Sequence, residues 1–263
     1  MEDIEHIVRY PVNRNHVTPI LLLHGAWHGA WCWEFWLDYF ASLGYEVHAI
    51  SLPGHGRSPL IKKHINFYTL SDYVNVLAHE INKISPLPVV VGHSMGGAIL
   101  QKHIEEHSLP GAVLLSSAPA KGVARMFLKM LYRHPLAALK TLLTLNSFHL
   151  VETPKLAQDW FLSEGVSIDV DQFHKSLVRE SITISFQLLL PFAKLNKVTS
   201  PVLVMAGEKD VIFTVSEGEA TAKKYKAKCV VFEGQAHNLM LEPNRLSIAN
   251  VIDEWITKKL KLP

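Results

Sequence analysis

The segment from Val89 to Gly97, Val-Val-Val-Gly-His-Ser-Met-Gly-Gly, constrains this chain more than any other. Its three β-branched residues predict a buried strand, and residues 98–107 have the pattern of a helix. Gly-x-Ser-x-Gly between a strand and a helix predicts a sharp turn with Ser94 at its tip. The glycines leave room where strand and helix converge, and free N–H groups at the start of the helix favour negative charge. Ser94 is therefore a candidate nucleophile.

Strands alternate with helices along most of the chain. Residues 4–12 predict an edge strand, and apolar runs predict buried strands at residues 20–23, 46–52, 89–91, 111–117, 201–206 and 229–232. Helical spacing appears at residues 33–40, 73–84, 98–107, 214–225 and 246–260. Thr69 or Ser71 is expected to cap the second of these helices, and Gly44 to end the first. This order predicts an α/β fold with a mostly parallel sheet covered by helices on both faces.

Residues 119–197 have a different pattern. They show successive helical patterns, broken at Pro135, Pro154 and Pro191, and no strand-like run bounded by turn residues. Because ligands of parallel sheets bind where the carboxyl ends of the strands converge, we expect this stretch to be a helical cap inserted over that edge. The predicted organisation is a core formed by residues 1–118 and 198–263, with a cap at residues 119–197.

Two segments of the predicted cap, residues 126–133 and 136–145, are strongly apolar. Lys129, Arg133, Pro135 and Lys140 interrupt them, so they are not expected to span a membrane. One interpretation is an ordinary amphipathic cap helix whose apolar face lines a pocket. The other is a basic, apolar lid that makes transient contact with a lipid surface.

The charge of the chain bears on its partners, and its cysteine content bears on its compartment. The chain has 26 Lys and Arg against 24 Asp and Glu, with no basic stripe, so nucleic acid is not an expected partner. Cys32 and Cys229 fall in apolar patterns and are expected to be buried thiols, which suits a reducing compartment. Residues 1–5 are acidic and lack an apolar run, so we expect a cytoplasmic protein without a secretory signal. A monomer and a homodimer both remain open.

A serine nucleophile needs a base, and the base needs a carboxylate to orient it. Asp210 follows the strand predicted at residues 201–206, and His237 follows the strand at residues 229–232. Ser94, Asp210 and His237 thus each lie just past the carboxyl end of a buried strand. Glu208 is the rival acid, but neighbours in a turn point in different directions, so Asp210 is preferred. No residues show the spacing of metal ligands, and neither a metal nor a cofactor is expected.

Stabilising an oxyanion requires two N–H groups aimed at one point. Met95 follows the candidate nucleophile and should supply one, and Ala26, in the turn after residues 20–23, should supply the other. Trp27 and His28 from the same turn are candidate pocket residues. Three other turn histidines are expected to act as structural hydrogen-bonding groups: His24, His55 and His93.

Taken together, the motifs resemble the α/β-hydrolase superfamily, in its capped serine-hydrolase branch of esterases and lipases. The similarity runs from about residue 20 to residue 243 and rests on His24-Gly25, Leu52–Ser58, Gly92–Gly97, Gly207–Asp210 and Gly234–His237. The resemblance implies the α/β-hydrolase fold, with Ser94 as nucleophile, Asp210 as acid, His237 as base, and Ala26 and Met95 as oxyanion donors. Residues 24–31 also resemble the first loop of plant methylesterases and hydroxynitrile lyases.

Two positions depart from that pattern. Many relatives have Asp where this chain has Ser51, and hydroxynitrile lyases carry Lys where Asn238 stands, which disfavours cyanohydrin cleavage. The expected function is hydrolysis of small carboxylic esters with an apolar acyl or alcohol part. Carbon–carbon, thioester and amide hydrolysis on the same three residues remain alternatives, as does a ligand-binding or receptor protein with little turnover.

Overall fold

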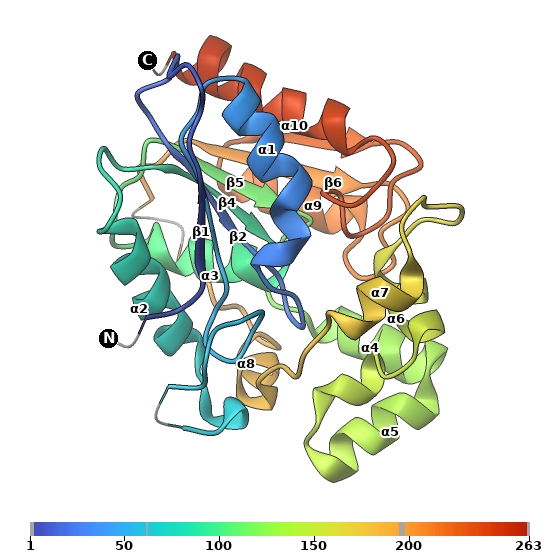
Figure 1. Cartoon of the computed structure of the whole chain (residues 1–263). Coiled ribbons are helices and arrows are strands. Elements are labelled where there is room, and N and C mark those ends of the chain that lie inside the picture. The colour runs from blue at the N-terminus through green and yellow to red at the C-terminus, as the bar shows by residue number, and fades with distance from the viewer. Residues whose placement is uncertain (1–2, 62, 195–197, 262–263) are drawn as a thin grey trace.

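A seven-stranded sheet forms the centre of the computed structural model, which describes residues 3–61, 63–194 and 198–261. The strand order is β1-β3-β2-β4-β5-β6-β7 (Figure 1). β1 is antiparallel to β3, and every other neighbouring pair is parallel, which confirms the predicted mostly parallel sheet. The strands are β1 His6–Arg9, β2 Ile20–Leu23, β3 Val47–Ile50, β4 Val89–His93, β5 Ala112–Leu115, β6 Val202–Gly207 and β7 Lys228–Phe232.

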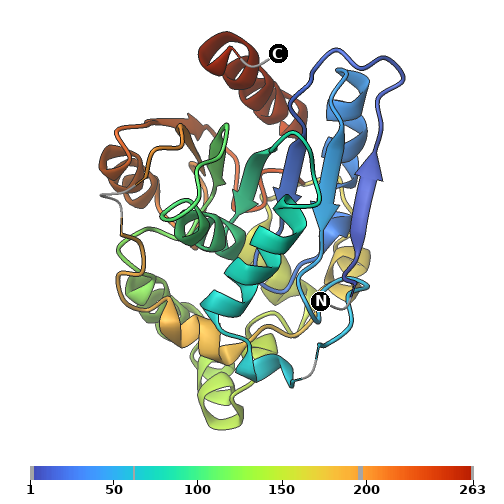
Figure 2. The same ribbon diagram turned by 90° about the vertical axis from the view of Figure 1, so that its left-hand side faces the viewer.

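Helices cover both faces of this sheet, as the alternation of strands and helices predicts. The covering helices are α1 Glu34–Ser42, α2 Leu70–Ile81, α3 Met95–His103, α9 Val215–Lys224 and α10 Arg245–Glu254. Leu22 and Val91 belong to the apolar cluster that includes α1 and α10, whereas their neighbours Leu21 and Val90 belong to the cluster on the opposite face. Figure 2 shows α2 and α3 on that second face. Side chains on successive strand residues thus enter two separate cores, which explains the continuous apolar runs in the sequence.

Local signals set most helix boundaries. Thr69 caps α2, because its hydroxyl accepts from the N–H of Asp72 while the Asp72 carboxylate accepts from the N–H of Thr69. Gly44 follows α1 with φ = 101°, a conformation that glycine adopts without strain. α3 begins at Met95, three residues before the predicted start, since Ser94 is itself the residue that caps it. α10 continues as a π-helical segment, Trp255–Leu260.

Five helices lie between β5 and β6, and residues 116–194 contain no strand. They are α4 Ala124–Arg133, α5 Pro135–Thr144, α6 Pro154–Phe161, α7 Val170–Lys175 and α8 Ile182–Gln187. Pro135 and Pro154 occupy the first positions of α5 and α6, where the missing N–H costs nothing. Short 3₁₀ turns occur at Ala30–Trp33, Ile65–Phe67 and Ser147–Leu150.

Both cysteines are free thiols. Cys32 is buried in the turn Ala30–Trp33, and Cys229 is half-buried in β7. Burial raises the pKa of the Cys32 thiol, so it stays protonated at neutral pH. Among the helices described, none combines the length and apolar character needed to cross a bilayer.

Candidate active site

Ser94 occupies a strained turn between β4 and α3. Its backbone has φ = 53° and ψ = −115°, a region that L-residues rarely adopt. The turn is held by the Ser94 N–H, which donates to the Leu115 carbonyl at 3.0 Å, and by the Ser94 carbonyl, which accepts from Ala118 at 3.1 Å. A Cβ on Gly96 would lie 2.4 Å from the His24 carbonyl oxygen, so the start of α3 approaches the end of β2 this closely only because this residue is glycine.

Asp210 and His237 meet at the same edge of the sheet. The Asp210 Oδ2 atom lies 2.7 Å from His237 Nδ1, and both side chains are buried. The other carboxylate oxygen accepts from the N–H groups of Ile212 at 2.7 Å and Phe213 at 3.0 Å. These bonds orient the carboxylate, and the carboxylate in turn orients the imidazole with its proton on Nδ1.

The rival acid, Glu208, points elsewhere. Its side chain is exposed and accepts from the N–H of Gly234 at 2.9 Å. The loops after β6 and β7 are in close contact, since a Cβ on Gly207 would lie 2.3 Å from the Ala236 carbonyl oxygen. That contact brings Asp210, and not Glu208, against His237.

The second ring nitrogen of His237, Nε2, is placed to accept a proton. Nε2 is buried and has no hydrogen-bond partner in the described part of the chain. No hydrogen bond joins it to Ser94 Oγ; in unliganded enzymes such catalytic contacts are often long and tighten when substrate binds. A neutral imidazole with its proton on Nδ1 presents a free lone pair at Nε2, which is the form that a general base requires.

Backbone N–H groups lie around Ser94. Ala26 and Met95 line the same cavity as Ser94, and a Cβ on Gly25 would lie 2.8 Å from Ser94 Cβ. Within the described residues, neither the Ala26 N–H nor the Met95 N–H donates a hydrogen bond to the protein. Two unpaired donors beside a serine hydroxyl are the arrangement that an oxyanion needs.

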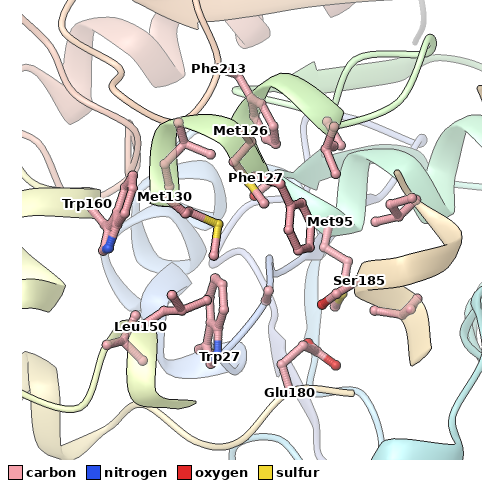
Figure 3. Close-up of a pocket in the computed structure, with 18 of the residues that line it drawn as sticks. Trp27, Met95, Met126, Phe127, Met130, Leu150, Trp160, Glu180, Ser185 and Phe213 are labelled. Carbon is pink, nitrogen blue, oxygen red and sulfur yellow. The ribbon is translucent and has the colours of Figure 1, made fainter. Parts of the chain in front are cut away.

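An apolar cavity of about 650 Å³, including space open to solvent, extends from Ser94 under the helices between β5 and β6. Its wall comes from both parts of the chain, as Figure 3 shows for Trp27, Met126, Phe127, Met130, Trp160 and Phe213. Glu180 and Ser185 add polar groups to the wall (Figure 3). An apolar lining with a few polar groups is typical of a small-molecule site.

Of the two candidate pocket residues, Trp27 lines the cavity and His28 does not. His28 is buried, with Nδ1 at 2.7 Å from the Ala26 carbonyl and Nε2 at 3.0 Å from Asn238 Nδ2. Burial, with the nearby His237 and His55, lowers the pKa of His28 to about 3, although the Ala26 hydrogen bond opposes this. The expectation that His28 belongs to the pocket is therefore wrong, because both ring nitrogens serve internal hydrogen bonds that hold the Ala26 turn.

We expect the stability of the folded protein to fall as the pH drops below about 6.5, partly through His28. The unfolded chain binds a proton there at the ordinary histidine pKa, whereas folded His28 stays neutral down to about pH 3. The free energy of unfolding should lose about 1.4 kcal/mol per pH unit from this residue alone. Urea unfolding at pH 4 to 7 should give a flatter curve for His28→Gln than for the wild type. An unchanged slope would contradict the prediction, and His64→Gln, at an exposed site, is the control.

Glu180 is a residue of the site that the sequence patterns did not single out. Its carboxylate is buried and accepts hydrogen bonds from His55 Nε2 at 2.9 Å, Tyr73 Oη at 3.2 Å and the Ser181 N–H at 2.6 Å. Burial alone lowers the pKa of His55, but the charge and hydrogen bond of Glu180 outweigh it and raise the pKa above its ordinary value. No local motif marks Glu180, since its side-chain partners His55 and Tyr73 lie more than 100 residues away in the chain.

His24, His93 and Ser51 have structural hydrogen-bond partners. His24 Nε2 accepts from the Leu52 N–H at 3.0 Å, and His93 Nε2 lies 3.2 Å from the His237 carbonyl. Ser51 donates to the Glu5 carboxylate at 2.6 Å, and the same carboxylate accepts from the Arg57 N–H at 3.0 Å. Glu5 thus supplies a carboxylate to the turn that contains Ser51. Across the described ranges, no His, Cys, Asp or Glu side chains form a group able to hold a metal ion.

Comparisons with known proteins agree with this architecture. The model of the alpha/beta hydrolase family matches residues 20–248. A putative chloroplastic methylesterase 15 of Arabidopsis thaliana is 31% identical over 102 residues, 37% of this chain and 22% of that protein. Norfluorocurarine synthase 1 of Strychnos nux-vomica is 37% identical over 100 residues, 36% of this chain and 37% of that protein. The chain therefore matches well under half the length of these curated relatives.

Solved structures match over almost the whole chain. A monoacylglycerol lipase of Paleococcus ferrophilus has a TM-score of 0.70 at 19% identity, covering 97% of this chain and 99% of that chain. A thermophilic esterase of Thermogutta terrifontis has a TM-score of 0.72 at 18% identity, covering 98% and 94%. At these identities the likeness concerns the fold. The family match spans most of the sequence, so the chain belongs to the alpha/beta hydrolase family.

Proposed function

We propose that this protein is a serine hydrolase that cleaves carboxylic esters with an apolar acyl or alcohol part, without a cofactor. The observation that carries the proposal is the buried Asp210–His237 hydrogen bond at the sheet edge where Ser94 opens into an apolar cavity. A serine in a strained turn, an oriented imidazole and an apolar binding space are the parts that acyl transfer requires.

Ser94 and His237 divide the chemistry between them. His237 takes the Ser94 hydroxyl proton on Nε2 while Oγ attacks the ester carbonyl, and it then returns this proton to the leaving alcohol. The resulting acyl-enzyme is hydrolysed by a water that the same imidazole deprotonates, and the proton then passes to Ser94 as the acid departs. Asp210 holds the Nδ1 proton in place and stabilises the imidazolium formed in each step.

The backbone N–H groups of Ala26 and Met95 stabilise the oxyanion that forms on the carbonyl oxygen in both steps. Each is unpaired and beside Ser94, so it is available without rearrangement. Because these donors sit in a wall of apolar side chains, water competes little for them and their effect on the transition state increases.

The cavity wall supports the choice of an apolar substrate. We place the cap at residues 119–197, of which residues 195–197 lie outside the described part of the chain. α4, α6 and α8 from this region contribute side chains to the cavity, among them Phe127, Trp160 and Ile184. The methylesterase name of one partial relative and the pyrethroid hydrolase of Sphingobium wenxiniae, 30% identical over 91 residues, are consistent with an ester substrate.

A panel of p-nitrophenyl esters from acetate to decanoate, combined with labelling by a fluorophosphonate probe, tests the proposal. We expect labelling of the native protein and turnover of the short and medium acyl chains. The absence of both labelling and turnover would contradict the proposal and favour a ligand-binding protein. Labelling without ester turnover would contradict the ester substrate and direct the search to thioesters, amides and carbon–carbon bonds.

A further inference from the structure

The hairpin formed by α4 and α5 carries an unusual amount of exposed apolar surface. Leu128, Leu131 and Tyr132 are spaced three and four residues apart and share one side of α4, with Tyr132 89% exposed. On α5, Leu136, Leu139 and Leu143 have the same spacing and share one side of the helix, with Leu143 76% exposed. With the remaining exposed leucines, this hairpin face comprises Leu128, Leu131, Tyr132, Leu136, Leu139, Leu142, Leu143 and Leu145. Exposed apolar side chains gathered on two successive helices are typical of an interaction site.

The charged residues of the hairpin itself are all basic. Residues 107–151 contain no Asp or Glu and five Lys or Arg residues, Lys121, Arg125, Lys129, Arg133 and Lys140. Three of these, Arg125, Lys129 and Arg133, follow each other at four-residue spacing in α4. Lys140 is paired with Glu152, and the Lys129 ammonium donates to the Val211 and Ile212 carbonyls. The hairpin face is therefore apolar with a cationic border.

The opposite side of α4 belongs to the cavity. Phe127 and Met130 line it, so the helix is apolar on two sides, with its basic residues between them. An ordinary cap helix requires only the inner side to be apolar, whereas Leu128, Leu131 and Tyr132 on the outer side of α4 are exposed. The hairpin lies at the end of the molecule opposite α10, where it projects from the sheet (Figures 1 and 2).

We infer that the hairpin face docks on an anionic lipid surface, with its leucines at the boundary of the acyl chains and its cations among the headgroups. Exposed apolar side chains bordered by Lys and Arg are the composition of helices that lie in the membrane interface. A second copy of the chain is the less suitable occupant, since apposing two such faces would bring the basic residues of one hairpin against those of the other. Docking there would place the cap side of the cavity next to a source of apolar substrates.

Vesicle co-sedimentation tests the inference. We expect the protein to bind phosphatidylcholine vesicles containing phosphatidylserine, more tightly than pure phosphatidylcholine and less tightly as salt rises. Leu136→Ser/Leu139→Ser/Leu143→Ser should weaken binding about tenfold or more. Arg125→Glu should weaken binding about fivefold or more, since a cation near an anionic surface contributes about that factor. The control is Leu246→Ser on α10, at an exposed leucine remote from the hairpin, which should bind as the wild type does.

Several results would overturn the inference. Absence of binding to both vesicle types, equal binding to both, or equal loss in the Leu246 control would each do so. A dimer in analytical ultracentrifugation that the triple variant dissociates, without vesicle binding, would assign the hairpin face to self-association instead. The triple variant should keep the wild-type melting temperature and fluorophosphonate labelling, which shows that it folds. Ser94→Ala should bind vesicles as the wild type does, so docking and ester hydrolysis can fail independently.

Discussion

Replacing Ser94 with alanine is expected to lower kcat for p-nitrophenyl butyrate roughly 10⁴–10⁶-fold and to abolish fluorophosphonate labelling. The hydroxyl is the only group of this residue that differs from alanine, and the proposed mechanism has no other nucleophile. Alanine and serine tolerate the φ of 53° equally, so the free energy of unfolding should change by less than about 1 kcal/mol. Steady-state kinetics and urea unfolding measure the two effects separately.

Ser116 provides a matched control for that experiment. It is a buried serine that directly follows the neighbouring strand β5, and its backbone also has a positive φ of 40°. It does not line the cavity beside Ser94. Ser116→Ala should therefore keep both hydrolysis and labelling. If Ser94→Ala kept them as well, the assignment of the nucleophile would be wrong.

Asp210→Asn is expected to lower kcat about 10³–10⁴-fold while the protein stays folded. The amide oxygen of asparagine can still accept from the N–H groups of Ile212 and Phe213, so the turn after β6 is retained. The amide NH₂ would then face His237 Nδ1 and force the imidazole proton onto Nε2. In that tautomer Nε2 has no lone pair with which to take the Ser94 proton.

Glu208→Gln is the companion to this variant. Glu208 lies two residues from Asp210, yet its exposed side chain contacts the N–H of Gly234 and not His237. Its kcat should stay within about twofold of the wild type, because surface substitutions away from a site change little. Full activity in Asp210→Asn together with loss in Glu208→Gln would reverse the assignment of the acid.

Local sequence was sufficient to predict the framework of the site. Parallel strands place their carboxyl ends at one edge, so turns that follow apolar runs converge whatever their separation along the chain. That rule predicts that Ala26, Ser94, Asp210 and His237 lie at the same edge of the sheet. The role of the glycines around Ser94 was equally predictable, because a close approach of backbone segments leaves no room for a Cβ.

Packing between residues distant in the chain decided the other contacts in and around the site. Nothing near Glu180 indicated that it would be buried against His55, and nothing near Ser51 indicated the carboxylate of Glu5. His28 shows the same limit, since a turn beside the site left open which way its ring would face. Its orientation depends on Asn238, which lies 210 residues away in the chain.

The same division between local sequence and distant packing applies to the hairpin of α4 and α5. The sequence by itself determined that α4 and α5 would be helical, apolar and basic, because periodicity and charge are properties of neighbouring residues. Only the tertiary structure decided which of the apolar residues are covered and which face solvent. Burial depends on what the rest of the chain places against each helix, and the core covers Phe127 and Met130 but leaves Leu128 and Leu143 exposed.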